Sequence, residues 1–355
     1  MKLLFALPGF HKYDRGAEVA LLAVANELAA SGEKVTVVGS GEDRPGTNYS
    51  FRHVGSISRE RFERFPNVPA LRSETGWEDL TFAANLVRKI NIDDFDATVT
   101  CAFPWTHWAL RRRKRGGPKH FFVTQNGDWP AVNDDSEFKY FDCDGLVCTN
   151  PDYFENNRAR WNCALVPNGA DLARFRPGPG SRAEFGLPED KKIVLMVSAM
   201  IETKRVADAV RAMAELEDAF LVVAGDGPLR DDVEGLANSL LPGRFKRISL
   251  PAAKMPALYN SADAFLHMSL LESFGNVFVE AMATGLPIVG HDTERLRWIV
   301  GDTEFLVDTE NRSSLVAQLR AALATGERPL NPNLNRFAWS TIAATYRDFI
   351  SRTLG

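Results

Sequence analysis

The sequence predicts an α/β fold made of two doubly wound domains, each a parallel sheet with helices on both faces. Short strands alternate with helical stretches along the chain, which is typical of parallel sheets joined by helical crossovers. The strands are apolar throughout rather than at every second residue, as strands buried on both faces are. Twelve such strands are more than one open sheet usually carries, and 355 residues are more than one domain usually contains.

The elements fall into two series in chain order. Strands of the first series are expected at Leu3–Leu7, Lys34–Gly39, Ala97–Ala102, His120–Thr124, Gly145–Thr149 and Ala164–Val166. Between the first two, Leu21, Val24 and Leu28 recur on one face of a helix, and Gly32 should end that helix. Strands of the second series are expected at Ile193–Val197, Phe220–Ala224, Arg247–Leu250, Ala264–His267, Pro287–Val289 and Glu304–Val307.

The domain boundary should fall between Val166 and Gly180, where turn residues and prolines replace periodicity. We expect a first domain over residues 1–166 and a second over residues 167–336. A final helix is expected to contain Phe337, Trp339, Tyr346 and Phe349. Because ligands of doubly wound domains bind beyond the carboxyl ends of the strands, a cleft between the two sheets is the expected site.

Composition disfavours several classes of protein. The 46 acidic residues outnumber the 42 Lys and Arg, and a net charge of −4 is a poor basis for coating nucleic acid. The four cysteines form no CxxC pair, which favours buried thiols over a metal site or disulfides. The apolar stretch from Met1 to Pro8 is too short for a signal peptide, and no apolar run is long enough to span a bilayer.

Common catalytic signatures are missing from the sequence. The turn after the first strand lacks GxGxxG, and neither GxxxxGK[ST] nor GxSxG occurs, which disfavours dinucleotide-dependent oxidoreductases, P-loop enzymes and hydrolases. Asp94 and Asp96 are spaced like a metal-binding DxD pair. They stand just before an apolar strand, however, so a solvated strand entrance is favoured over a Mg²⁺ site.

The most informative stretch is 264–289, where an apolar strand leads through a loop into a helix. If the helix begins near Gly275 or Asn276, its free N–H groups and positive dipole end form a phosphate site. Glu280 would then lie about 6–7 Å further along the axis, where a carboxylate suits the ribose diol of a nucleotide. Glu272 would reach the opposite end of the ligand. The alternative is that Glu272 caps the helix and Glu280 is a solvated surface acid.

Six motifs, taken in their order and spacing, resemble those of the family-4 glycosyltransferases. The most specific is that family's EX7E motif, which is similar to the segment from Glu272 to Glu280 with Gly285-Leu286-Pro287 behind it. The other five are Arg15-Gly16-Ala17-Glu18, Val166-Pro167-Asn168-Gly169-Ala170-Asp171, Ala224-Gly225-Asp226-Gly227-Pro228, Tyr259 with Ala262-Asp263, and Phe337-Ala338-Trp339. The resemblance covers most of the chain. It implies the GT-B fold, with two Rossmann-like domains facing a central cleft and a closing helix that returns to the first domain.

The resemblance also implies a retaining enzyme that uses a nucleotide sugar, and it assigns roles to single residues. Glu272 would contact hydroxyls of the donor sugar, and Glu280 would bind the ribose diol. Gly16 would let its loop approach the phosphates, where a side chain would obstruct them; an ordinary turn before a helix is the alternative. The implied donor-binding residues are Gly16, Arg205, Ser273, Phe274, Gly275, Asn276, Val277 and Glu280, with sugar and phosphate held by the backbone N–H groups of 274–277.

The chain departs from the family pattern in its expected phosphate cations. Ala199 stands where the family usually has an Arg, while Lys204 matches the Lys that follows five residues later. Arg205 and Arg15 are the candidate replacements. The alternative for Arg205 is an ordinary charge on a helix surface.

A second departure concerns the strand at His120–Thr124, after which many relatives carry a His near the reacting sugar. This chain has Asn126 there. A retaining front-face reaction can use the leaving phosphate oxygen as its base, so the missing His does not exclude catalysis. Asn126 could still bind a sugar hydroxyl. The alternative is that Asn126 only forms an Asn-Gly turn. His267 is expected to be a satisfied core histidine, and His291 receives no role.

The sequence therefore predicts a cytoplasmic hexosyltransferase that moves a sugar from a UDP- or GDP-sugar to a glycan or glycolipid, as in polysaccharide or lipopolysaccharide synthesis. Glu272, Lys204 and Asn126 are its expected catalytic residues, and no metal or other cofactor is expected. The alternative is a catalytically silent nucleotide-sugar or glycan-binding homologue. The basic run Arg111–Arg115, with aromatic residues before it, could contact anionic lipid at the inner membrane face; a cationic helix C-terminus is the other reading.

Overall fold

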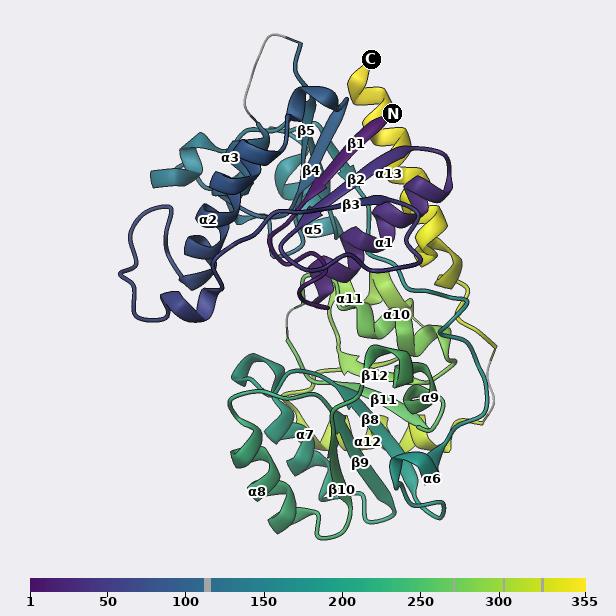
Figure 1. Cartoon of the computed structure of the whole chain (residues 1–355). Coiled ribbons are helices and arrows are strands. Elements are labelled where there is room, and N and C mark those ends of the chain that lie inside the picture. Colours follow the sequence, from purple (N-terminus) through teal and green to yellow (C-terminus); the bar gives the residue numbers. More distant parts are fainter. Residues whose placement is uncertain (112–115, 271, 303, 327–328) are drawn as a thin grey trace. The chain divides into compact units, whose positions relative to one another are not determined.

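The computed structural model of the chain describes residues 1–111, 116–270, 272–302, 304–326 and 329–355 (Figure 1). These residues form two compact units. Unit 1 comprises Met1–Gly169 together with Trp339–Gly355, and unit 2 comprises Ala170–Ala338. Each unit is built around its own parallel sheet with helices on both faces, so the predicted fold class of two doubly wound α/β domains is confirmed.

Unit 1 contains a seven-stranded sheet in the order β3-β2-β1-β4-β5-β6-β7, and every adjacent pair is parallel. Its strands are β1 (Lys2–Ala6), β2 (Lys34–Gly39), β3 (Ser50–His53), β4 (Ala97–Thr100), β5 (Lys119–Val123), β6 (Gly145–Cys148) and β7 (Cys163–Leu165). Its helices are α1 (Gly16–Ala30), α2 (Glu74–Lys89), α3 (Trp105–Leu110), α4 (Trp129–Val132), α5 (Pro151–Asn157) and α13 (Trp339–Leu354), with short 3₁₀ turns η1 (Arg59–Phe62), η2 (Ile92–Asp94) and η3 (Ser136–Tyr140). The strand order reverses at β1, which places the end of β1 at a position where ligands of such sheets bind.

Unit 2 contains a six-stranded parallel sheet in the order β10-β9-β8-β11-β12-β13. Its strands are β8 (Lys192–Val197), β9 (Ala219–Ala224), β10 (Phe245–Ile248), β11 (Ala264–His267), β12 (Ile288–His291) and β13 (Phe305–Val307). Its helices are α6 (Arg182–Phe185), α7 (Val206–Met213), α8 (Arg230–Leu240), α9 (Met255–Tyr259), α10 (Asn276–Ala283), α11 (Glu294–Val300) and α12 (Arg312–Ala324), with 3₁₀ turns η4 (Glu202–Lys204), η5 (Ala252–Lys254) and η6 (Leu334–Phe337). The strand order reverses between β8 and β11. The loops after these two adjacent strands therefore start side by side at the carboxyl ends of the strands.

The apolar strands are explained by the helices that cover both faces of each sheet. In β1, Leu3 and Phe5 pack in the core that α1 and α13 help to form, whereas Leu4 and Ala6 pack toward α2 and α3. All four side chains are fully buried. A strand between two helical layers therefore needs apolar residues at successive positions, and burial of each large side chain contributes about 1.5–3 kcal/mol.

Two expectations about the elements were wrong. The edge strand β3 was missed because its residues Ser50–His53 are largely exposed and lack an apolar run. The final helix begins at Trp339, since Phe337 ends η6 in unit 2. There the buried Phe337 ring packs 5.7 Å from the ring of Phe274 and 6.4 Å from that of Trp298. Within the described residues, no helix combines the length and the hydropathy that a bilayer span requires.

Candidate functional site

The loop after β8 is held in place by the turn after β9. The N–H of Met200 donates to the carbonyl of Asp226 at 2.9 Å. A Cβ on Gly225 would lie 1.9 Å from the carbonyl oxygen of Ser198, and one on Gly227 would lie 2.5 Å from that of Met200. The glycines of this turn are therefore required by backbone packing, which fixes the segment that carries Lys204.

The loop after β11 turns sharply into α10. Gly275 occupies the N-cap position with a left-handed φ of 81°, and α10 begins at Asn276, as the sequence predicted. A Cβ on Gly275 would also collide with the Phe278 ring, so glycine is needed here on two grounds. The Phe274 side chain is buried against Phe337, which anchors the loop in the core and leaves only its backbone for a ligand.

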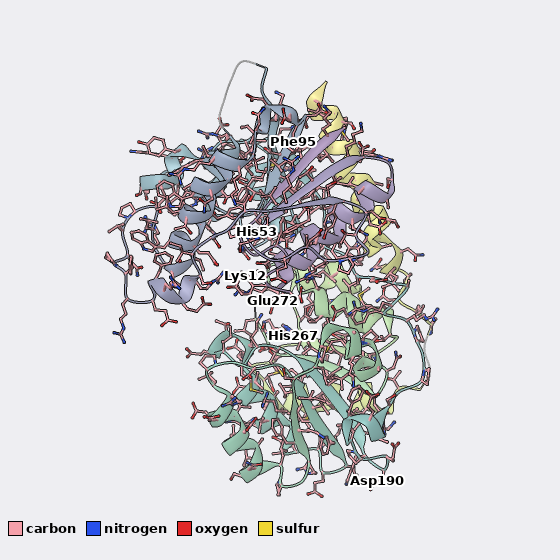
Figure 2. The ribbon with its side chains drawn as sticks, viewed as in Figure 1. Lys12, His53, Phe95, Asp190, His267 and Glu272 are labelled. Atoms are coloured by element: carbon pink, nitrogen blue, oxygen red, sulfur yellow. The ribbon has the colours of Figure 1, made fainter. Side chains whose placement is uncertain are left out.

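Glu272 is the centre of an ion-pair cluster at the carboxyl end of β11. Its carboxylate oxygen Oε1 pairs with Nζ of Lys204 and lies 3.3 Å from Nε2 of His267, the last residue of β11. Figure 2 labels Glu272 and His267 in this region. Its backbone carbonyl accepts a hydrogen bond from the Arg295 guanidinium of α11. Lys204 and Glu272 are therefore in direct contact. From the sequence, the two residues could be connected only through their family motifs.

These contacts keep Glu272 ionised. Burial by itself would raise the pKa of Glu272, but the hydrogen bonds and charges of His267 and Lys204 outweigh it and lower the pKa to about 2. His267 is buried, as expected of a core histidine, but the expectation was incomplete because its ring also faces Glu272. Glu272 is thus a fixed negative charge whose side chain keeps some access to solvent.

Glu280 differs from Glu272 in its surroundings. It lies on α10 and its Oε2 accepts a hydrogen bond of 2.8 Å from the hydroxyl of Tyr259, at the end of α9. Burial raises the pKa of Glu280 to about 7, against the smaller lowering effects of the Tyr259 hydrogen bond and the charge of Arg174. The alternative of a solvated surface acid is therefore wrong. Glu280 is a partly buried carboxyl group that can accept a further hydrogen bond.

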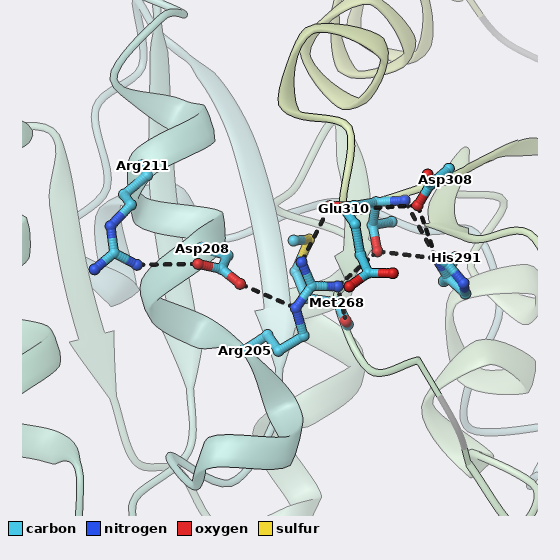
Figure 3. Close-up of polar contacts among 8 residues, drawn as sticks. Arg205, Asp208, Arg211, Met268, His291, Asp308 and Glu310 are labelled. Carbon is cyan, nitrogen blue, oxygen red and sulfur yellow. Dashed lines mark hydrogen bonds and ion pairs between the residues drawn. The ribbon is translucent and has the colours of Figure 1, made fainter.

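Arg205 connects the ends of several strands in unit 2 (Figure 3). Its Nε donates to Asp208 at 2.9 Å, its Nη1 to the Met268 carbonyl and the Thr309 hydroxyl, and its Nη2 to the Thr309 carbonyl. Nδ1 of His291 lies 3.1 Å from the Thr309 hydroxyl, so His291 belongs to the same hydrogen-bond network. All three guanidinium nitrogens of Arg205 thus have protein partners, and its contact with a donor phosphate remains a prediction.

The predicted residues of unit 1 lie in the turn after β5 and at the start of α1. Asn126 is exposed in a turn after β5, where Gly127 has a φ of 122°, so the Asn-Gly turn is present. Gly16 is the first residue of α1, and a Cβ there would meet no atom within 4 Å. The packing of the protein therefore does not explain glycine at position 16. The ligand roles of both residues remain predictions.

Other predicted features are placed as follows. Residues 112–115 of the basic run lie outside the described residues, while Arg111 donates from Nη1 to the carbonyl of Tyr140 at 2.8 Å. Asp96 precedes β4 and accepts from the backbone N–H of Lys2 at 2.7 Å, as a strand entrance would. The described residues contain no group of three or more His, Cys, Asp and Glu that could hold a metal ion. All four cysteines are free thiols.

Three site residues escaped sequence reasoning or were misread: Tyr259, Arg295 and, in part, His267. Tyr259 reaches Glu280 from 21 positions away, and Arg295 reaches Glu272 from 23 positions away. Neither contact follows from a local pattern. The only available signal was that both belong to segments adjoining the EX7E stretch at the same edge of the sheet.

The fold and the site define a class of protein. Two α/β units, each with its own parallel sheet, are the architecture of GT-B glycosyltransferases. Sucrose-phosphate synthase from Thermosynechococcus elongatus superposes with a TM-score of 0.76 at 20% identity, over 99% of each chain. HepE from Anabaena, solved in complex with UDP-glucose, gives 0.71 at 17% identity, over 99% of this chain and 100% of that one. These likenesses show the fold.

Sequence comparison identifies the family. The model for Glycosyltransferase Family 4 matches residues 15–174, and that for Glycosyl transferases group 1 matches residues 179–337. The chain belongs to the family-4 glycosyltransferases.

Curated relatives include two lipopolysaccharide core biosynthesis glycosyltransferases of Rhizobium meliloti (strain 1021). LpsE is 28% identical over 293 residues, which span 82% of this chain and 80% of LpsE. LpsD is 28% identical over 221 residues, which span 60% of this chain and 62% of LpsD. The match to LpsD thus covers less than two thirds of that protein.

Proposed function

We propose that this family-4 chain is a retaining hexosyltransferase that transfers a sugar from a UDP- or GDP-sugar to a glycan or glycolipid acceptor, without a metal ion. The observation that carries the proposal is the ion-pair cluster of Glu272, Lys204 and His267 beside the N-terminus of α10. It joins a fixed carboxylate for sugar hydroxyls to a cation and the positive end of a helix for phosphate.

The donor would extend along α10. Its diphosphate would be held by Lys204 together with Ser273 and the N–H groups of the first turn, with the sugar toward Glu272. Its ribose diol would donate to Glu280, the partly buried carboxyl group that already accepts a hydrogen bond from Tyr259. This arrangement is supported by the spacing of the two acids, one before the helix and one on its second turn.

The reaction would proceed on one face of the sugar. The bond between the anomeric carbon and the diphosphate oxygen breaks, a bond from that carbon to the acceptor hydroxyl oxygen forms, and the hydroxyl proton moves to the leaving diphosphate. Lys204 and the helix N–H groups would stabilise the charge that develops on that leaving group, the task that a metal ion performs in other transferases. Asn126 of unit 1 would bind a hydroxyl of the reacting sugar.

The relatives support the substrate classes. HepE was solved with UDP-glucose, and LpsD and LpsE are named for lipopolysaccharide core biosynthesis. We propose a cytoplasmic protein that extends a glycan or glycolipid of that kind. Contact of the run Arg111–Arg115 with the inner membrane face remains part of the proposal.

Calorimetry with UDP and GDP, followed by a donor hydrolysis assay with the corresponding sugars, tests the function. We expect one nucleotide to bind and its sugar conjugate to release free sugar slowly. Glu280→Ala should weaken binding of the nucleotide. Glu294 is an exposed acid on the first turn of α11, and Glu294→Ala should leave that binding unchanged. Binding without sugar release would favour the catalytically silent homologue, which the missing Arg at Ala199 makes the second candidate. Binding of neither nucleotide would refute both.

A further inference from the structure

Trp129 is an exposed aromatic side chain that the proposed donor site does not use. It is the first residue of α4, in the segment that follows β5. All seven tryptophans lie in the described part of the chain, and Trp129 is the most exposed of them, at 39%. Ligands of parallel sheets bind beyond the carboxyl ends of the strands, and β5 leads into this segment at that end. An exposed indole at this position is therefore a candidate ligand contact.

Neighbouring rings hold the indole in place. The ring of Phe103 lies 5.6 Å from that of Trp129 at an interplanar angle of 79°, and the ring of Phe138 lies 5.3 Å from it at 77°. Both contacts have the edge-to-face geometry that aromatic pairs prefer. Phe103 itself packs against a buried core cluster of unit 1. The exposed ring is thus fixed before a ligand arrives, which lowers the entropy cost of binding.

The turn before Trp129 is shaped around the same ring. A Cβ on Gly127 would lie 2.9 Å from Cδ1 and 3.5 Å from Nε1 of Trp129. The backbone of Gly127 therefore packs against the pyrrole edge of the indole, where any other residue would displace the ring. No described residue accepts a hydrogen bond from Nε1 of Trp129. The indole N–H thus keeps its capacity to donate to a ligand.

Polar groups with spare bonding capacity stand beside the ring. Asn126 is exposed, and its amide forms no hydrogen bond with a described residue. Oδ2 of Asp128 accepts from Nδ2 of Asn156 at 3.3 Å and from Nδ2 of Asn157 at 3.1 Å, whereas no described residue donates to Oδ1. A flat apolar surface bordered by amide and carboxylate groups matches a pyranose ring, which has a face of C–H groups and a rim of hydroxyls.

The charges in this segment disfavour a membrane contact for Trp129. Residues 128–135 contain three aspartates, at positions 128, 134 and 135, and no Lys or Arg. Asp134 is paired with Arg160 at 2.7 Å. Anionic lipid attracts polybasic segments, so carboxylates beside the ring would be repelled by it. A neutral ligand rich in hydroxyls meets no such repulsion.

We propose that Trp129 binds a pyranose ring of the acceptor by stacking against its C–H face, while Oδ1 of Asp128 accepts a hydrogen bond from one of its hydroxyls. The assignment to the acceptor rests on the proposed function, in which Asn126 of the same segment binds the reacting sugar. A ring on Trp129 would lie next to that sugar, where the attacking hydroxyl is needed. The sugar-binding role itself does not depend on that function. The proposal narrows the acceptor to one that presents a sugar ring.

Saturation-transfer NMR on the full chain tests the sugar site without a donor. The probes are the methyl α-pyranosides of glucose, galactose and mannose. We expect at least one probe to receive saturation mainly at the C–H protons of one ring face, and Trp129→Ala to weaken its binding about tenfold. Tyr140→Ala is the matched control, because Tyr140 is an aromatic of unit 1 that is 55% exposed, and it should bind as the wild type does. If no probe binds, or the two variants bind equally, the proposal is wrong.

Two further variants guard against a folding defect. Trp129→Phe keeps an aromatic face beside Phe103 and Phe138, and it should bind the probe more tightly than Trp129→Ala but less tightly than the wild type. A folded Trp129→Phe protein that binds no better than Trp129→Ala would contradict stacking. Asp128→Asn should weaken the probe about threefold, whereas Asp135→Asn, which changes an exposed acid nearby, should not. Equal affinities of these two variants would contradict the Asp128 contact.

Activity measurements show which sugar the ring binds. Trp129→Ala should raise the KM for the methyl glycoside as acceptor and leave donor hydrolysis, in which water is the acceptor, unchanged. An equal loss in both reactions would mean that Trp129 binds the donor sugar, and the acceptor assignment would be wrong. If no glycoside binds and Trp129→Ala weakens binding to phosphatidylglycerol vesicles, the ring is a membrane contact and the proposal fails. Glycoside binding through Trp129 by a chain that binds neither UDP nor GDP would refute the proposed function but support the sugar site.

Discussion

Glu78 in unit 1 and Glu272 in unit 2 each lie between two basic side chains, and the two carboxylates differ in their accessibility. In unit 1 Glu78 lies between Lys12 and Arg59, and its side chain is 1% exposed. In unit 2 Glu272 lies between Lys204 and His267, and its side chain is 20% exposed. A closed-off carboxylate can only balance cations, whereas an accessible one can also meet a ligand. Similar residue types therefore form a structural support in unit 1 and, in the proposed function, a ligand-binding group in unit 2.

The largest effect is expected from the cation of the accessible cluster. Lys204→Ala should lower turnover on the order of 10²- to 10³-fold, the cost of removing one preorganised donor to a charge that develops in the transition state. Donor affinity should fall less, and the free energy of unfolding should also fall, because Glu272 loses one of the two partners that lower its pKa. Steady-state kinetics checks this, with Lys191→Ala, a partly exposed cation of unit 2, as the control. A fully active Lys204→Ala enzyme would mean that the phosphate site is misplaced.

The next effect tests the closed cluster. Glu78→Ala should reduce the free energy of unfolding by about 3 kcal/mol, because it leaves Lys12 and Arg59 without their shared partner. Urea denaturation measures the loss. Glu60→Ala, an exposed acid on η1, should cost much less. If the loss for Glu78→Ala were as small, the contrast between the two clusters would disappear.

A smaller effect is expected at the ribose. Glu280→Ala should weaken the nucleoside diphosphate and the sugar nucleotide equally, by about 2 kcal/mol or roughly 30-fold, because both contain the ribose diol. Calorimetry with both ligands measures this. Unchanged affinity for the nucleoside diphosphate would show that Glu280 does not bind the ribose.

The two acids of the EX7E motif should also act in opposite directions as pH changes. The pKa of Glu280 is raised to about 7, so the folded protein retains a proton that the unfolded chain has lost, and stability from this group falls as pH rises from about 4.5 to about 7. The pKa of Glu272 is lowered to about 2, so its contribution is present above about 4.5 and lost as pH falls toward 2.

Unfolding curves collected across pH measure these opposite slopes, each at most about 1.4 kcal/mol per pH unit for one group. Glu280→Gln should flatten only the upper window, and Glu272→Gln only the lower one. A Glu280→Gln protein with the wild-type slope between pH 4.5 and 7 would show that Glu280 does not titrate there.

The sequence predicted most of the fold because a strand buried on both faces is recognisable as a short run of successive apolar residues. Leu3–Ala6 are apolar at successive positions, and both faces of β1 are indeed covered. The polar edge strand β3 carries no such pattern and was missed. Gly275 and the start of α10 were predictable because a helix start has local signals, whereas the placement of Phe337 depends on its packing against Phe274 in three dimensions.

The candidate site was only partly predictable, since its key contacts join distant segments. The pairing of Lys204 with Glu272 spans 68 positions and that of Arg205 with Thr309 spans 104. Motif resemblance pointed to Lys204 and Glu272, but no local pattern could show that the Arg205 guanidinium is bonded to Thr309. Likewise, Tyr259 was noted as part of a motif, while its hydroxyl contact with Glu280 depends on how α9 packs beside α10.

The most direct test of the central claim is Glu272→Gln, measured for turnover, nucleoside diphosphate affinity and stability in the same preparations. If Glu272 is an accessible group that binds the donor sugar, turnover should fall while the affinity for UDP or GDP stays close to wild type. The free energy of unfolding near pH 7 should fall as well, because the lowered pKa of Glu272 stabilises the fold at that pH. The nucleoside diphosphate has no sugar group for Glu272 to contact, so its affinity should not change when that contact is lost. An equal loss of turnover and diphosphate affinity would contradict the claim and show that Glu272, like Glu78, serves only the fold.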